Sequence, residues 1–159
     1  MRYANDMPQT TTASAEAAPA ARPATLAADL RVSVMKLARR LRQQRSDDDI
    51  STGQYSVLGA LVNDGPKTPR ELAEHEKVQP PSMTRTLNCL VDAGLVMRTD
   101  HPDDGRQVLM SVTEHGAAVV RETRKQRTAW LAKRIAELSP EDRATLARAS
   151  EIALRIAES

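Results

Sequence analysis

The chain has 159 residues, a formal net charge of +2 and a single cysteine, Cys89. This length fits one domain, or a compact module with extensions. The small net charge does not by itself indicate a nucleic-acid partner. One cysteine excludes an internal disulfide and a zinc site built from four thiolates, so we expect a reduced, cytoplasmic setting. No apolar run approaches the ~20 residues that cross a bilayer, so we expect no membrane partner.

The composition also constrains the core. The chain has no phenylalanine, one tryptophan and two tyrosines. Aliphatic side chains must therefore supply nearly all of the buried area, which suits helices better than a sheet sandwich. We predict a mainly helical fold.

The first part of the chain divides into a tail and a helix. Residues 1–24 are rich in alanine, threonine and proline and have few bulky apolar side chains, so we predict a disordered tail. Residues 25–49 then carry apolar side chains at helical spacing, which predicts an amphipathic helix to about Arg45. The apolar positions are Leu26, Leu30, Val34, Leu37 and Leu41. The basic residues of this helix are by themselves typical of a solvated face.

Three later helices have clearly marked starts. In each, a hydroxyl residue is followed three positions later by Glu, Gln or Asp, a pattern that satisfies free amides at the start of a helix. The pairs are Ser51 with Gln54, Thr68 with Glu71, and Ser139 with Asp142. We predict a helix after each pair, and the one after Thr68 is expected to end near Lys77.

Residues 80–94 predict a helix with two unlike sides. With each residue rotated by ~100°, one side is apolar and the other can face a partner. The apolar side holds Met83, Leu87, Leu90 and Val91, and the other side holds Ser82, Arg85 and Cys89. Gly94 can take the left-handed conformation that ends a helix, with Leu95 packed back on it.

A hairpin and a long helix are expected next. Leu95–Thr99 and Val108–Val112 have strand-like compositions, and an Asp-Gly step between them indicates a tight turn. Thr113 then caps a helix that continues to about Leu138. A short helix, a tight link, a second helix and a hairpin together predict a winged helix-turn-helix, whose second helix lies in the major groove of DNA.

The second helix carries residue types that can donate to phosphates or base edges. They are Ser82, Thr84, Arg85, Thr86 and Asn88. Arg85 lies nearly opposite the apolar centre and is the first choice for a base contact. On an isolated helix a solvated surface arginine would be the ordinary explanation. The capped helix before it and the hairpin after it favour DNA.

The expected tip of the hairpin holds Asp104, Gly105 and Arg106. Gly105 can adopt the positive φ of a tight turn, and Arg106 can approach the minor groove, whose negative potential favours arginine. Asp104 can hold an arginine by a charge-assisted hydrogen bond before DNA arrives. A plain surface turn is the alternative for this segment taken alone.

Five short motifs occur together in this part of the chain: TPRELA at 68–73, SMTR at 82–85, GLVMR at 94–98, DDGR at 103–106 and VTEHG at 112–116. By these motifs the chain resembles the MarR family of bacterial winged-helix regulators. The order of elements agrees from Leu26 to the C-terminus, and the motif match covers about Thr68 to Gly116.

The resemblance implies a transcriptional regulator, a repressor that binds double-stranded DNA as a homodimer and responds to a small-molecule effector. Residues 25–49 would form a dimerisation helix, 50–113 the DNA-binding domain, and 114–159 the long helix and a C-terminal dimerisation helix. Its DNA contacts would be Ser82, Thr84 and Arg85 in the major groove, Thr68, Arg70 and Arg98 at phosphate, and Arg106, supported by Asp104, in the minor groove. The sequence names no ligand site, although the surroundings of Tyr55 or Trp130 are the expected place.

The chain departs from the common family pattern in two respects. Gln79 precedes Pro80 and Pro81 where many relatives have a hydroxyl cap, so this helix has fewer free amides for a phosphate. The missing phenylalanine puts in doubt an aromatic pocket for phenolic compounds.

The sequence offers little support for other functions. His75, His101, His115 and Cys89 show no short metal-ligand spacing, so we expect no metal site and no cofactor. Cys89 as an oxidant sensor is less favoured than a small residue on a helix flank. We find no phosphate loop or catalytic motif, so we do not expect an enzyme. A winged-helix protein-interaction module without DNA readout stays open, but it would not need both Arg85 and Arg106.

Overall fold

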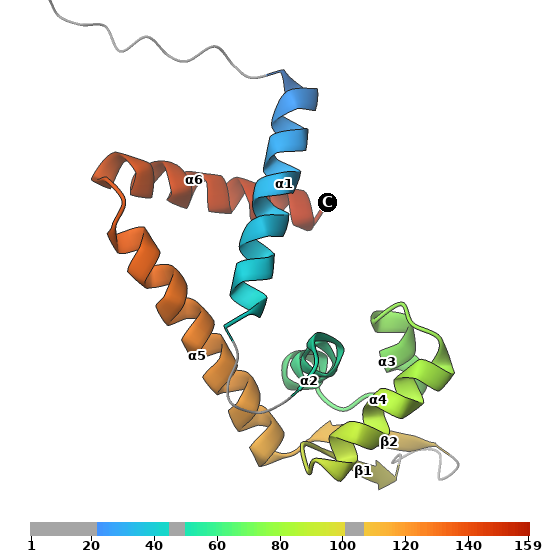
Figure 1. The fold of residues 1–159 in the computed structure, drawn as a ribbon. Helices are drawn as coiled ribbons and strands as arrows, with labels where there is room; N and C mark the ends of the chain where they lie inside the picture. Colours follow the sequence, from blue (N-terminus) through green and yellow to red (C-terminus); the bar gives the residue numbers. More distant parts are fainter. Residues whose placement is uncertain (1–21, 45–49, 101–106) are drawn as a thin grey trace, which may run out of the picture. The chain divides into compact units, whose positions relative to one another are not determined.

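The structure is a computed structural model that describes residues 22–44, 50–100 and 107–159. Within these ranges it has six helices and a two-stranded antiparallel sheet (Figure 1), which confirms the mainly helical prediction. The elements are α1 (Pro23–Arg42), α2 (Thr52–Asp64), α3 (Pro69–His75), α4 (Pro80–Asp92), β1 (Val96–Asp100), β2 (Val108–Val112), α5 (Glu114–Ala136) and α6 (Pro140–Ala157). The predicted tail, apart from its last residues, lies outside the described residues.

The chain forms two compact units that divide between Lys36 and Leu37. The described part of the first unit is the N-terminal stretch of α1. The second unit holds α2 to α6 and the sheet. None of the helices in the described ranges is long and apolar enough to cross a lipid bilayer.

The predicted helix starts are confirmed. Ser51 and Thr68 each form a full capping box, in which the cap hydroxyl accepts from the amide three residues on and that residue's side chain accepts from the cap amide. Ser139 accepts from the Asp142 amide, and Thr113 accepts from the Gly116 amide. Each start is therefore set by residues that are close in sequence.

The helices α3 and α4 end in the same way, with one residue at positive φ. Gly94 has φ 68°, its amide donates to the Val91 carbonyl, and the Leu95 amide donates to the Leu90 carbonyl. This is the Schellman arrangement, and buried Leu95 and Leu90 supply its apolar contact, as the sequence predicted. Lys77 takes the corresponding place after α3, at φ 54°.

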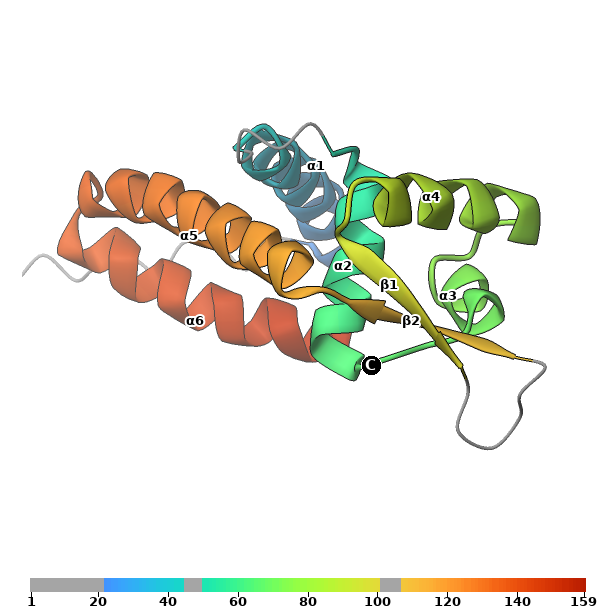
Figure 2. The same ribbon diagram turned by 90° about the horizontal axis from the view of Figure 1, so that it is seen from below.

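The core lies in the second unit and is entirely aliphatic. Its buried residues come from α2 to α5 and both strands: Val57, Leu58, Ala60, Leu61, Leu72, Ala73, Met83, Leu87, Leu90, Leu95, Val96, Met110, Val119 and Val120. The expectation that aliphatic side chains fill the core is therefore confirmed. Only the first half of α5 contributes to it, and the second half extends away from the sheet with α6 folding back from its end (Figure 2).

The hairpin is closed against two other elements. Val96 to Asp100 pair with Val112 to Val108, one residue later on the first strand than predicted, because the Leu95 amide and carbonyl are used at the ends of α4 and β2. On its other side, Met110 exchanges two main-chain hydrogen bonds with Lys67, of 2.8 and 3.1 Å. This isolated bridge, which was not predicted from the sequence, joins the middle of β2 to the residue before the cap of α3.

The helices α1 and α6 leave their apolar side chains uncovered. Neither helix has a buried residue. The exposed large apolar side chains of these two helices are Leu26, Leu30, Val32, Val34, Met35, Leu37, Leu146, Ile152, Leu154 and Ile156. Such a concentration of exposed apolar surface is typical of a face that another molecule covers.

Candidate nucleic-acid interface

The helix α4 buries one row of side chains and exposes the opposite one. Met83, Leu87 and Leu90 are buried, whereas Ser82 and Arg85 are exposed. This confirms the amphipathic pattern. Among the residues that the structure describes, none forms a hydrogen bond or ion pair with the Arg85 guanidinium. Its donors are therefore available to a partner on the solvent side.

Two of the predicted contact residues already use their hydroxyl hydrogens. Thr84 donates to the Pro80 carbonyl at 3.0 Å, and Thr86 donates to the Ser82 carbonyl at 3.1 Å. A threonine in this arrangement has to give up the internal bond before it can donate to a phosphate oxygen. In the described arrangement these hydroxyls can only accept.

The start of α4 offers few amides to a phosphate. Gln79 makes no side-chain cap, Pro80 and Pro81 have no N–H, and the Ser82 amide donates to the Gln79 carbonyl at 2.9 Å. This agrees with the departure from the family pattern noted in the sequence. The donors that this end of the helix offers are therefore mostly side chains.

The helix α3 presents two predicted phosphate contacts, each of which has a partner within the helix. The Thr68 hydroxyl accepts from the Glu71 amide at 3.2 Å and donates to the Glu71 carboxylate at 2.9 Å. The Arg70 Nε donates to Glu74 Oε1 at 2.9 Å, and both side chains are largely exposed. Thr68 therefore acts first as a helix cap, whereas Arg70 remains accessible.

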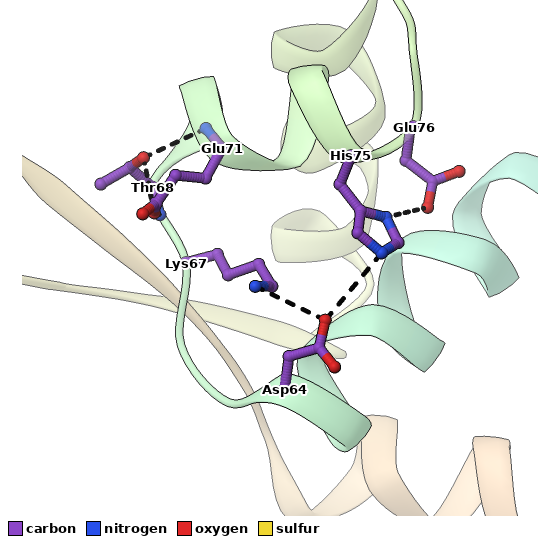
Figure 3. A network of polar contacts seen from close by, with 6 residues as sticks. All are labelled: Asp64, Lys67, Thr68, Glu71, His75 and Glu76. Carbon is purple, nitrogen blue, oxygen red and sulfur yellow. Dashed lines mark hydrogen bonds and ion pairs between the residues drawn. The ribbon is translucent and has the colours of Figure 1, made fainter. Parts of the chain in front are cut away.

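Polar contacts hold α3 against α2, as Figure 3 shows. His75 lies between two carboxylates, with Nδ1 3.1 Å from Glu76 Oε1 and Nε2 3.9 Å from Asp64 Oδ2. Lys67 Nζ lies 3.5 Å from the same Asp64 oxygen, and the Ser56 hydroxyl donates to Glu76 at 3.0 Å. Within the described ranges, no three His, Cys, Asp or Glu side chains are grouped so that they could hold a metal ion. These contacts join α3 and the residue after it to α2.

The hairpin lies beside α4 and contacts it through Arg98. The Arg98 Nη2 donates to Asn88 Oδ1, so two residues that were predicted separately are brought together. Asp104, Gly105 and Arg106, predicted at the tip, lie outside the described residues. Cys89 is exposed and unpaired on α4.

A cavity of about 550 Å³ lies between α2 and α5. Three arginines, Arg42, Arg124 and Arg127, line it together with hydroxyl and amide side chains. Arg124 donates to Asn63 at 2.8 Å, and the Arg127 guanidinium lies 4.2 Å from the centre of the Tyr55 ring. The lining also includes the Asp64 carboxylate and His75, so the cavity has an excess of basic side chains and one aromatic side chain, Tyr55.

One of the two residues near which a ligand was expected lines this cavity. Tyr55, which was expected near a ligand, lines the cavity, whereas Trp130 stacks on Arg134 and is not among its lining residues. Arg124 and Arg127 also line it but were not singled out from the sequence. Their spacing of three positions places them on one side of a helix, and this was the available signal.

Comparison with known proteins agrees with the geometry. The sequence pattern of the MarR family matches residues 50–108. An uncharacterized HTH-type transcriptional regulator of Mycobacterium bovis is 45% identical over 135 residues, which cover 85% of this chain and 94% of that protein. A crystal structure from Pseudomonas aeruginosa has a TM-score of 0.78 at 32% identity and covers 89% of this chain and 99% of that chain. A mutant MarR from Escherichia coli, complexed with operator DNA, has a TM-score of 0.58 at 29% identity over 82% of this chain and 94% of that chain. This chain belongs to the MarR family of winged-helix transcriptional regulators.

Proposed function

We propose that this regulator is a repressor that binds a pseudo-palindromic operator as a homodimer and releases it when a small-molecule effector binds. One observation carries the DNA part of the proposal: Arg85 is exposed opposite the buried row of the second helix of a helix-turn-helix. That position faces the floor of the major groove when such a helix docks. A guanidinium there can donate two hydrogen bonds to O6 and N7 of guanine.

The other predicted DNA contacts differ in whether their side-chain donors are already used within the protein. Ser82, one turn before Arg85 on the same exposed side, is proposed as a second base contact. Thr84 and Thr86 contribute as acceptors or through their methyl groups, because their hydrogens are used within α4. Arg70 is proposed as a phosphate contact, and Thr68 supports it by capping α3.

The wing is proposed to reach the minor groove. This rests on the residue types Asp104, Gly105 and Arg106 and on the family resemblance. The strands before and after these residues are paired with each other. Two main-chain hydrogen bonds between Met110 and Lys67 also join the hairpin to the segment that leads into α3. The Escherichia coli relative complexed with operator DNA supports the same use of the fold.

A second copy of the chain is the proposed cover for the exposed apolar side chains of α1 and α6. Neither helix buries a residue in a single chain, and a two-fold pair would bury these surfaces against each other. Light scattering at micromolar concentration tests this directly. A mass equal to one chain would contradict the homodimer.

The basic cavity between α2 and α5 is the proposed effector site. Arg42, Arg124 and Arg127 line it, and guanidinium groups favour carboxylates or phosphates. An anionic effector that binds there would bias the spacing between the winged region and the C-terminal helices.

Selection of bound fragments from genomic DNA, followed by a release screen with small anions, tests the function. The Arg85→Ala variant should lose about 1 to 3 kcal/mol on the selected site and show relaxed base preference. Equal losses on the selected site and on random DNA would remove Arg85 from base reading. Failure of the wild-type dimer to retain any duplex would favour the alternative, a winged-helix module that binds protein.

A further inference from the structure

Asn88 lies on the flank of α4 that faces the hairpin. It is exposed, one turn after Thr84, and both residues line a groove of about 220 Å³ between α4 and the sheet. Buried Leu87 and Met110 lie in the same groove. Asn88 is therefore turned away from the outermost line of the helix, where Arg85 lies.

Arg98 lies in the middle of β1, opposite a residue of β2 that is hydrogen-bonded on both sides. Its Cα is paired with that of Met110, whose main chain bonds to Lys67 on the other side. From this position the Arg98 side chain extends to α4, where Nη2 donates to Asn88 Oδ1 at 2.5 Å. A guanidinium has five N–H donors, so most of them remain for another acceptor.

The chemistry of asparagine decides between two roles for Asn88. An asparagine that reads adenine uses both ends of its amide, with Oδ1 accepting from N6 and Nδ2 donating to N7. In this structure Oδ1 accepts from Arg98, so the amide is oriented toward the hairpin and not toward a base edge on the outer side of α4. A fixed guanidinium beside a recognition helix is instead well suited to a phosphate oxygen at the groove edge.

We propose that Asn88 is a positioning residue: it holds the Arg98 guanidinium against α4, so that Arg98 contacts a backbone phosphate while α4 is in the major groove. This inference rests on the proposed DNA-binding function. It gives Asn88 a supporting role in place of the direct contact with a phosphate or base edge that its residue type suggested. It also joins the hairpin to the recognition helix, so that both dock as one body.

The test compares Asn88→Ala, Arg98→Ala and the double variant of the full-length protein. Affinity is measured by fluorescence anisotropy on a selected operator duplex and on a random duplex of equal length, over a series of salt concentrations. Each single variant should weaken both duplexes by a similar factor, roughly 3- to 10-fold, and lower the salt slope by about one. The double variant should bind no more weakly than Arg98→Ala, and base preference should be unchanged.

Two controls separate this role from general damage. The melting temperatures of the variants should match the wild type, because both side chains are exposed. Arg148→Ala, which removes one positive charge from α6, should leave the salt slope unchanged.

Two results would overturn the inference. In the first, Asn88→Ala weakens the operator alone and relaxes preference at one base pair. In the second, the losses of the two single variants multiply. Both results require that the wild type binds the operator. If the wild type binds neither duplex, the proposed function is contradicted, and so is this inference.

Discussion

The Arg127 guanidinium lies over the Tyr55 ring, 4.2 Å from its centre, and joins α5 to α2 at the wall of the basic cavity. Contacts of this kind contribute about 0.5 to 1 kcal/mol where they are partly exposed. We expect Arg127→Gln and Tyr55→Leu to be coupled by that amount in the free energy of unfolding. A double-mutant cycle by urea denaturation, at one protomer concentration, measures the coupling. Strictly additive losses would show that the stacked pair does not stabilise the fold.

Gly116 should be intolerant of any side chain. A Cβ atom at this position would lie 2.1 Å from the Leu95 carbonyl oxygen and 2.9 Å from a Val112 methyl, because α5 begins directly against the hairpin. We expect Gly116→Ala to cost about 2 to 3 kcal/mol of unfolding free energy.

Gly53 is the matched control for Gly116, since nothing lies within 4 Å of a Cβ atom built there. We expect Gly53→Ala to be neutral or to stabilise by up to about 1 kcal/mol. Thermal unfolding followed by circular dichroism compares the two variants. Equal effects would mean that the close approach of α5 to Leu95 is not maintained in solution.

Lys77 holds a backbone conformation that suits glycine. It ends α3 at φ 54°, in the same arrangement that Gly94 adopts after α4 at φ 68°. A left-handed residue with a Cβ costs roughly 1 to 2 kcal/mol, part of which the greater chain entropy of glycine offsets. Lys77→Gly should therefore raise the unfolding free energy by up to about 1 kcal/mol, and Lys77→Val should lower it. A stabilising valine would be incompatible with this conformation.

The parts of the fold that could be predicted depend on residues close together in the chain. Ser51, Thr68 and Gly94 act within one helical turn, so they reveal the helix ends without knowledge of the packing. The apolar row of α4 is likewise a local pattern, and it correctly separated buried Leu87 from exposed Arg85.

The remaining features depend on contacts between distant segments. The bridge between Lys67 and Met110 joins segments that are far apart in the chain, so no local pattern reveals it. The partner of Asn88 is set by the strand register, which places Arg98 opposite Met110. Candidate residues could thus be named from their types, whereas their roles depend on which of their hydrogen-bonding atoms the fold already uses.

The apolar stripe of α6 gives a direct test of dimerisation. Ile152 lies on the stripe and is 40% exposed in the single chain. We expect Ile152→Glu to shift the protein toward a single-chain mass in light scattering, because a charge cannot be buried there without a partner. Arg155→Glu introduces the same residue on the polar side of the helix and should leave the mass unchanged. If Ile152→Glu remains fully dimeric, α6 does not use this stripe for pairing.

The ion pair between Arg70 and Glu74 predicts that removing the Glu74 carboxylate strengthens binding to DNA. Its Nε donates to Glu74 at 2.9 Å on the exposed side of α3, and the carboxylate would be repelled by a nearby phosphate. Glu74→Gln should tighten binding to operator and random DNA alike by a few fold, whereas Arg70→Ala should weaken both and lower the salt slope by about one. The unfolding free energy should change by less than about 0.5 kcal/mol in either variant, since exposed pairs of this spacing contribute little. An Arg70→Ala protein with unchanged affinity and salt slope would place the phosphate contact elsewhere on α3.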